Sequence, residues 1–407
     1  MMQIKPIFAA LRRHKAGTVL ISLQIALTLA IVCNALFIIQ QRVTQLSQPS
    51  GLDEANVLRI QNQWVGKHSE AEYGPMVATD LALLRQIPGV VDAYSTNSLP
   101  LSQGGWSMGL SLKPEQRKST AQTAIYFADD HALATLGLKL VAGRNFRADE
   151  IRPMPSKDTL RPSVVIVTRE LADKLFPDGH AVGKPVYIVD RPSIIVGVVQ
   201  RLQTPWPGVR WGNTSSTLIP LQLLTNGTNY VVRTRPGQLE TVRRAAPAAL
   251  LAANRMRVIP DDGGVMSFAQ IRADTFASDR GMAILMAVIC VVLLAITAAG
   301  IVGLTSFWVG QRRKQIGVRR ALGARRSDIL NYFLTENLLI GIGGVVLGVV
   351  MAYGLNLWMV TRFEMAHLAA QYVLAGVAVL LLLGQGAVLA PALRASKVPP
   401  VEATRSI

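Results

Sequence analysis

Positive side chains gather in one segment of this sequence, QRRKQIGVRRALGARRSDIL (residues 311–330), which holds seven Arg or Lys residues and one Asp. Guanidinium groups bind carboxylates and phosphates, often through two hydrogen bonds at once. The segment could therefore bind nucleic acid, anionic lipid or an acidic protein surface, or act only as a topology signal. Its chemistry is ionic recognition rather than bond breaking.

Motifs of known catalytic and metal sites are missing from the sequence. It contains no GxxxxGK[ST] phosphate loop, no HExxH and no GxSxG. The histidines are scattered and form no Cys/His cluster of zinc-binding spacing; they are His14, His68, His131, His180 and His367. We expect a non-catalytic chain that binds no cofactor or metal ion itself.

Four apolar stretches predict a membrane protein. Half of the residues are hydrophobic and only 16% are charged, well below the usual quarter for soluble domains. The predicted spans are residues 16–41, 281–311, 329–361 and 365–393, each long enough to cross about 30 Å of hydrocarbon. The first is too long for the apolar core of a signal peptide, so we expect an uncleaved anchor.

The distribution of charge predicts the topology. Cations predominate in the N-terminus (1–15), in the loop 312–328 and in the tail 394–407, which the positive-inside rule assigns to the cytoplasm. Residues 42–280 then form an outer domain with 27 cations and 21 acids. The basic loop also lacks the interleaved aromatic residues of a base-stacking platform. We therefore exclude nucleic acid as a partner.

The outer domain has the pattern of a mixed α/β fold. Expected strands are 56–60, 90–95, 123–129, 163–168, 184–189, 193–199 and 229–235, and expected helices are 75–87, 168–176 and 238–253. The loop 204–216 carries Trp206 and Trp211. These side chains could contact a periplasmic partner or pack over the strands, and the sequence leaves both open.

Three residues inside the third predicted span invite interpretation. Glu336 is the only acid in that span, about two turns from its cytoplasmic end, so it could be functional or could pair with a loop arginine. Gly344 and Gly348 have GxxxG spacing, which lets helix backbones approach closely. We expect these glycines to pack against another helix.

Several segments together carry a family resemblance. They are FAALRRHKAGTVLISLQIALTLAI (8–31), AGRNF (142–146) with the later SVVIVTRELADKLFPDG, AVGKPV and IIVGVV, then IGVRRALGARRSDI (316–329) and APALRASKVPPVEATRS (390–406). In this order they resemble the MacB-type permease family of ABC systems, which also includes FtsX and the lipoprotein-releasing LolC and LolE. The resemblance covers nearly the whole chain.

The resemblance implies a fold and partners. It implies four transmembrane helices and, between the first two, a periplasmic core domain with a membrane-proximal part (50–115 and 225–275) around an inserted part (116–224). It also implies a bacterial inner membrane and a dimer with a second permease copy or a paralogue. Two cytosolic ABC ATPase subunits would bind ATP and Mg, and a periplasmic adaptor is a further candidate partner.

Two functions are compatible with the resemblance. In the first, ATP hydrolysis by a separate ATPase moves the periplasmic domain and exports or extracts a substrate at the outer face. In the alternative, the chain is an FtsX-like regulatory module that activates an extracytoplasmic partner without transport. The AGRNF series favours the first.

The basic loop becomes a candidate coupling elbow (312–328) in this family context. A helix there would separate Val318 and Leu322 from the arginines, Gly323 suits a left-handed C-terminal cap, and Ser327 with Asp328 can start the next helix. The expected ATPase-docking residues are Gln311, Gln315, Ile316, Val318, Arg319, Arg320, Leu322, Gly323, Arg325 and Arg326. The arginines could also contact anionic lipid. Gln311 and Gln315 replace residues that are usually acidic in the family.

Overall fold

The chain forms two units in the structure, a computed structural model that describes residues 15–156, 158–363 and 366–399. The membrane unit contains the described residues up to Thr44 and from Asp279 onward, and the outer domain is Gln45–Ser278. The predicted N-terminus (1–15) and tail (394–407) fall mostly outside the described residues. Each unit has its own hydrophobic clusters.

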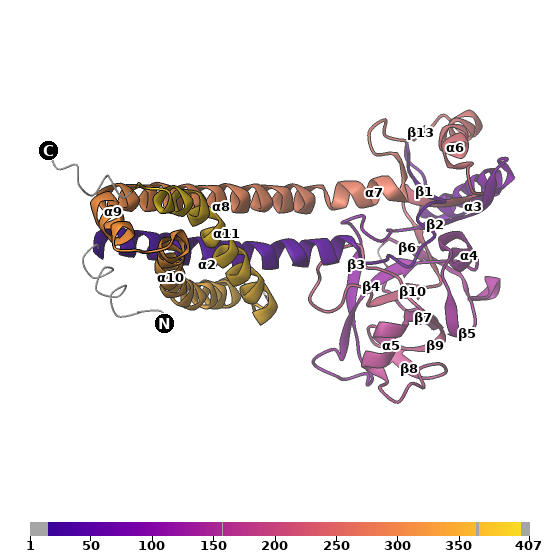
Figure 1. Ribbon diagram of the computed structural model, residues 1–407. Helices are drawn as coiled ribbons and strands as arrows, with labels where there is room; N and C mark the ends of the chain where they lie inside the picture. Colours follow the sequence, from indigo (N-terminus) through magenta and orange to yellow (C-terminus); the bar gives the residue numbers. More distant parts are fainter. Residues whose placement is uncertain (1–14, 157, 364–365, 400–407) are drawn as a thin grey trace. The chain divides into compact units, whose positions relative to one another are not determined.

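Four long helices of the membrane unit are apolar enough to cross a membrane, which confirms the predicted spans (Figure 1). They are α2 (Lys15–Leu46), α8 (Ala277–Gln311), α10 (Arg326–Phe363) and α11 (Ala370–Ser396), and a short helix, α9 (Arg313–Ala321), lies between α8 and α10. α11 begins at Ala370, whereas the fourth span was predicted from residue 365, which lies outside the described residues.

Glycines allow α2 to pack tightly against its neighbours. A Cβ atom at Gly344 would lie 2.9 Å from Cβ of Ile25, and one at Gly348 would lie 2.9 Å from Cβ of Leu29. Both distances are shorter than carbon atoms tolerate, so α10 can approach α2 only where no side chain intervenes. The expectation that Gly344 and Gly348 serve helix packing is confirmed, and the partner is α2.

The first sheet of the outer domain is antiparallel, with strand order β13-β1-β12-β2 and β14 paired to β1. Its strands are β1 (Val57–Trp64), β2 (Val90–Thr96), β12 (Gly227–Thr234), β13 (Arg257–Val258) and β14 (Val265–Ser267). Apolar residues alternate along β1, and their buried side chains share a core with helices α3 (Glu70–Gln86) and α6 (Leu239–Ala253). α3 starts before the predicted residue 75, with Pro75 inside it.

The second sheet is mixed, with strand order β3-β4-β10-β7-β9-β5 and β8 paired to β9. Its strands are β3 (Trp106–Leu110), β4 (Ala121–Phe127), β5 (Leu140–Gly143), β7 (Val164–Thr168), β8 (Pro185–Tyr187), β9 (Pro192–Val199) and β10 (Ser216–Ile219). A two-stranded ladder joins β6 (Arg152–Pro155) to β11 (Leu221–Leu224). The remaining short helices are α4 (Ala132–Leu136), α5 (Arg169–Leu175), α7 (Phe268–Thr275) and the 3₁₀ turn Ala148–Glu150.

The segment order of the two sheets makes the second an insertion in the first. β1 and β2 precede the second sheet in the chain, and β12, β13 and β14 follow it. The second sheet begins with β3 at Trp106 rather than near residue 116, because β3 pairs antiparallel with β4. The predicted mixed α/β fold between the first and second spans is confirmed.

Charged side chains that are only partly buried connect the two sheets of the outer domain. Arg85 of α3 donates from Nε to Asp92 of β2 (3.2 Å) and lies 3.9 Å from Asp129, in the loop after β4. His131 of that loop places Nδ1 3.0 Å from both oxygens of Asp92. Burial raises the pKa of Asp129 to about 6, although His131 and Arg85 act in the opposite direction.

Asp129→Asn should remove a pH dependence of folding. The folded wild type holds a proton on Asp129 up to a pKa of about 6, whereas an unfolded Asp releases it near pH 3.9. Protonation of Asp129 therefore contributes to the free energy of unfolding below the pKa of the unfolded state, and this contribution is lost as pH rises through the pKa of the folded state. Between about pH 5 and pH 7.5, the free energy of unfolding of the wild type should fall by about 1 kcal/mol relative to that of Asp129→Asn. Chemical denaturation of the full chain measures this, and a constant difference would contradict it.

Candidate coupling site

The candidate elbow is a short helix between two sharp turns. α8 ends at Gln311, Arg312 has non-helical angles (φ −98°, ψ 10°), and α9 follows. At its far end Gly323 has φ 98°, the left-handed conformation that glycine adopts without strain. Ala324 N donates to Arg319 O (3.0 Å) and Gly323 N to Arg320 O (3.1 Å). These two bonds form a Schellman cap, so the predicted helix end at Gly323 is confirmed.

α10 begins earlier than predicted. Its first residue is Arg326, and Arg325 occupies the position before it. Asp328 accepts a hydrogen bond from the backbone N–H of Arg325 (2.9 Å), so the carboxylate caps the helix from inside the first turn. The expectation that Ser327 and Asp328 start the helix is therefore wrong by one to two residues, although Asp328 does stabilise its N-terminus.

One face of α9 packs on the spans. Ile316 is buried in a cluster with Trp308 of α8, Phe333 of α10 and Val388 of α11. Gly317 is buried beside it. We expected Ile316 to contact an ATPase, but the structure uses it as the apolar anchor of the elbow.

Arg312 anchors one end of the elbow. Its Nη1 donates to both carboxylate oxygens of Glu336 in α10, at 3.0 and 2.9 Å. The side chains are 12% and 3% exposed. The alternative that Glu336 pairs with a loop arginine is therefore confirmed, and this pair joins the start of α9 to α10.

Arg320 anchors the other end. Its Nη1 donates to the backbone carbonyls of Ser396 (3.1 Å) and Val398 (2.9 Å), at the end of α11. Carbonyls at a helix C-terminus lack intrahelical partners and carry partial negative charge, so they suit a guanidinium group. Arg320, expected to dock an ATPase, instead holds α9 to α11.

The opposite face of α9 is exposed. Leu322 is 82% exposed and Val318 is also exposed. Arg319 lies with its guanidinium carbon 5.2 Å from the ring centre of Tyr332. The other expected docking residues are exposed as well, namely Gln311, Gln315, Gly323, Arg325 and Arg326. We define Val318 and Leu322, with the exposed arginines Arg319, Arg325 and Arg326, as the outer face of the elbow.

The two tryptophans of the loop 204–216 pack on the outer domain. Both are partly buried against the core between the sheets. Trp206 donates from Nε1 to the carbonyl of Gln103 (3.0 Å). Of the two alternatives left open by the sequence, packing over the strands is the one observed. Trp106 on the edge strand β3 is more exposed than either of them, and sequence reasoning did not single it out.

Within each unit, an arginine joins the two chain segments that lead to the other unit. In the membrane unit, Arg42 Nη1 lies 2.6 Å from Asp279 Oδ1, which links the end of α2 to the start of α8. In the outer domain, Arg272 of α7 donates to the carbonyls of Leu46 and Gln48 (2.7 and 2.6 Å) and to Glu54 (2.7 Å). The sequence could not indicate these pairs, because the partners are more than 200 residues apart.

The arrangement of the elbow suits a contact surface. Among the described residues, no group of three or more His, Cys, Asp or Glu side chains is placed to hold a metal ion. The elbow presents an apolar pair beside arginines, held from behind by an apolar anchor and two arginine contacts. Such a surface can bind a protein groove lined by acids.

Comparison with known proteins identifies the family. Residues 18–249 match the MacB-like periplasmic core domain, and residues 287–400 match the FtsX-like permease C-terminal family. The chain belongs to the MacB-type permease family. Most of its outer domain, up to residue 249, lies within the segment that matches the MacB-like periplasmic core domain.

The comparison also found similar individual proteins. The macrolide export ATP-binding/permease protein MacB of Chromobacterium violaceum is 29% identical over 273 residues, covering 66% of this chain and 41% of that protein. The uncharacterized ABC transporter permease YvrN of Bacillus subtilis is 23% identical over 98% of both chains. The crystal structure of the periplasmic region of MacB from Actinobacillus actinomycetemcomitans covers 57% of this chain and 97% of that one, with 14% identity and a TM-score of 0.35. This MacB-type permease spans about half the length of the MacB relatives it matches.

Proposed function

We propose that this chain is the permease subunit of a MacB-type ABC transporter, driven by a separate cytosolic ATPase that binds ATP and Mg. ATP-driven movement of the ATPase subunits would shift the elbow, and the spans would pass the movement to the periplasmic domain. That domain would export or extract a substrate at the outer face of the bacterial inner membrane. The elbow and both termini would then lie in the cytoplasm, as the positive-inside rule predicts from the charge distribution.

The observation that supports this proposal is the two-sided attachment of the elbow. α9 follows α8 after the single non-helical residue Arg312. Arg312 links the start of α9 to α10 through Glu336, and Arg320 links α9 to the end of α11. A displacement of α9 therefore acts on three spans at once. A loop that served only as a topology signal would not need these contacts.

The exposed outer face is the expected ATPase contact. A Leu side chain that becomes fully buried contributes about 1.5–3 kcal/mol, and Leu322 is available for such burial. Arg319 and the two arginines before α10 can pair with acids around the groove. A second permease subunit, a periplasmic adaptor and anionic lipid complete the proposed set of partners.

Leu322→Glu should detach the ATPase. Insertion of a charge into the apolar contact should lower ATPase recovery about tenfold or more when the tagged chain is purified in mild detergent. Quantitative mass spectrometry of the co-purified ABC ATPase measures the effect. Arg320 is left unchanged, because its substitution would release α9 from α11.

Met256→Glu provides the matched control. Met256 is an exposed apolar residue of the outer domain, so the same change there should leave ATPase recovery unchanged. Unaltered recovery with Leu322→Glu would refute the docking assignment. If the complex with the ATPase stayed intact and activated an extracytoplasmic hydrolase without moving any compound, the FtsX-like regulatory function would replace export.

A further inference from the structure

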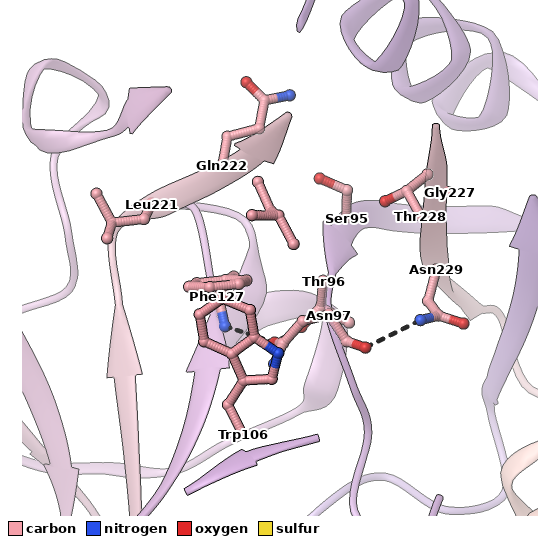
Figure 2. A pocket seen from close by; sticks show the side chains of 11 residues that line it. Ser95, Thr96, Asn97, Trp106, Phe127, Leu221, Gln222, Gly227, Thr228 and Asn229 are labelled. Atoms are coloured by element: carbon pink, nitrogen blue, oxygen red, sulfur yellow. Dashed lines mark hydrogen bonds between the residues drawn. The ribbon is translucent and has the colours of Figure 1, made fainter. Parts of the chain in front are cut away.

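A pocket in the outer domain lies where the two sheets meet (Figure 2). Its volume is about 160 Å³, which equals the space of about five water molecules. Ser95 and Thr228 come from the first sheet, Trp106 and Phe127 from the second, and Gln222 from the β6–β11 ladder. A ligand in this pocket would contact all three.

Trp106 supplies an open aromatic surface. Its ring meets the buried ring of Phe127 edge to face, with centroids 5.2 Å apart and an interplanar angle of 72°. Phe127 therefore holds the indole in one orientation, while Trp106 as a whole remains 39% exposed. A rigid, exposed indole face is suited to stacking against a flat ligand at little cost in side-chain entropy.

Neutral polar groups surround this aromatic surface. Asn229 donates from Nδ2 to the carbonyl of Asn97 (3.1 Å), which fixes the amide in place (Figure 2). Within the part of the chain that the structure describes, the side chains of Ser95, Gln222 and Thr228 make no hydrogen bond to protein. Hydroxyl and amide groups both donate and accept, so the pocket can satisfy a ligand of mixed hydrogen-bonding character.

Charge is absent from the pocket lining. None of its eleven residues is ionisable at neutral pH, although the domain around them is rich in Arg, Lys, Asp and Glu. An anionic or cationic ligand would lose water without gaining a counter-charge, and a wholly apolar ligand would leave the amides unsatisfied. The ligand that fits is uncharged, carries several hydroxyl groups and has one flat C–H face.

We propose that this pocket binds a neutral saccharide unit, with a sugar ring stacked on Trp106 and its hydroxyls bonded to Thr228, Gln222 and Asn229. The pocket is partly open, so part of one six-membered ring would lie inside it while the other substituents stay in solvent. Because the site joins both sheets of the outer domain, a bound sugar would fix their relative arrangement. A sugar of an extracytoplasmic glycan or of a glycosylated compound would meet the same groups.

The test measures saccharide binding by the purified full chain in a detergent without a sugar head group. The probes are maltose, cellobiose and the N-acetylglucosamine dimer, with neutral tripeptides as the competing class. Saturation-transfer NMR identifies the bound ring, and titration calorimetry gives its affinity. We expect at least one saccharide to bind, with Kd in the range of about 0.1–10 mM, typical of a single shallow site.

Variants locate the site. Trp106→Ala should weaken binding about tenfold or more, and Trp106→Phe should weaken it less, because a smaller ring remains on Phe127. Thr228→Val keeps the shape of the side chain and removes the hydroxyl, so affinity should fall about threefold to tenfold. Thr159→Val is the matched control, since Thr159 is exposed outside the pocket and should not matter.

Three outcomes would overturn the proposal. They are no saturation transfer to any saccharide, saccharide binding that survives Trp106→Ala, and binding of a neutral tripeptide in preference to sugars. Preferential binding of a tripeptide would show that the pocket recognises peptides instead of sugars. Because no ATPase is present in this experiment, its result is independent of the proposed coupling function.

Discussion

Glu336→Leu should destabilise the membrane unit by about 3–5 kcal/mol, the usual cost of removing one partner of a buried ion pair. The change leaves the guanidinium of Arg312 among Trp308, Tyr332 and other apolar groups, with only a weak 3.4 Å hydrogen bond to the Tyr332 hydroxyl described there. Thermal unfolding of the detergent-solubilised full chain should therefore shift to a clearly lower temperature. Arg312→Met should also destabilise the membrane unit, because it removes two hydrogen bonds from the buried carboxylate of Glu336.

The double variant Arg312→Met/Glu336→Leu measures the interaction energy between the two side chains apart from their contacts with other residues. Replacing both partners by apolar residues of similar volume is often nearly neutral. The double variant should therefore be more stable than either single one, with a coupling energy of about 2 kcal/mol or more in the double-mutant cycle. If the double variant lost the sum of the unfolding free energies lost by the two single variants, the two side chains would not interact.

The same double variant also tests how the elbow transmits movement. It would retain the apolar packing around Ile316 but lose the ionic contact between the start of α9 and α10. If the pair serves only stability, ATPase stimulation by the permease should recover together with the unfolding temperature. If it transmits movement, the unfolding temperature should recover while stimulation stays low.

Local signals explain why the spans and the elbow could be predicted. Long apolar runs leave no alternative to membrane helices, and Gly323 terminates a helix through its own backbone freedom. The GxxxG spacing predicted a close helix contact, but it could not name α2 as the partner. These features depend on residues close together in the sequence, so a single chain carries enough information for them.

The different contacts of the elbow arginines could not be predicted from the sequence. Arg312 and Arg320 lie directly beside Arg313 and Arg319 in the sequence, so nothing local distinguishes them. The partner of Arg312 lies 24 residues away in the chain, and those of Arg320 lie 76 and 78 residues away. The edge strand β3 escaped prediction for a similar reason, since its pairing with β4 determines its conformation. With β3 unseen, neither Trp106 nor the pocket beside it could be recognised.

Asp80→Ala should destabilise the outer domain most strongly, by about 3–5 kcal/mol. Asp80 of α3 accepts two hydrogen bonds from Arg257 of β13 (2.8 and 2.9 Å) and one from the hydroxyl of Tyr230 in β12 (2.5 Å). Burial raises the pKa of Tyr230, so this hydroxyl stays protonated and must donate. Without the carboxylate, the hydroxyl of Tyr230 loses its acceptor, and the buried guanidinium of Arg257 keeps only its hydrogen bonds to Asn62 and Asn254.

We expect burial, rather than hydrogen-bond geometry, to determine how much the Asp80–Arg257 pair stabilises the outer domain. An exposed ion pair of the same chain provides a matched control. Arg161 and Asp190 also form a two-bond contact (2.9 and 2.8 Å), but their side chains are 41% and 51% exposed, against 2% and 4% for Arg257 and Asp80. Asp80→Ala should lower the unfolding temperature of the outer domain by about 10 °C, whereas Asp190→Ala should leave it unchanged, because water replaces the lost partner. Hydrogen exchange of β1, β12 and β13 peptides in the full chain distinguishes local opening of the first sheet from global unfolding. Equal effects of the two substitutions would show that the ion-pair geometry, and not its burial, sets the stability of the sheet.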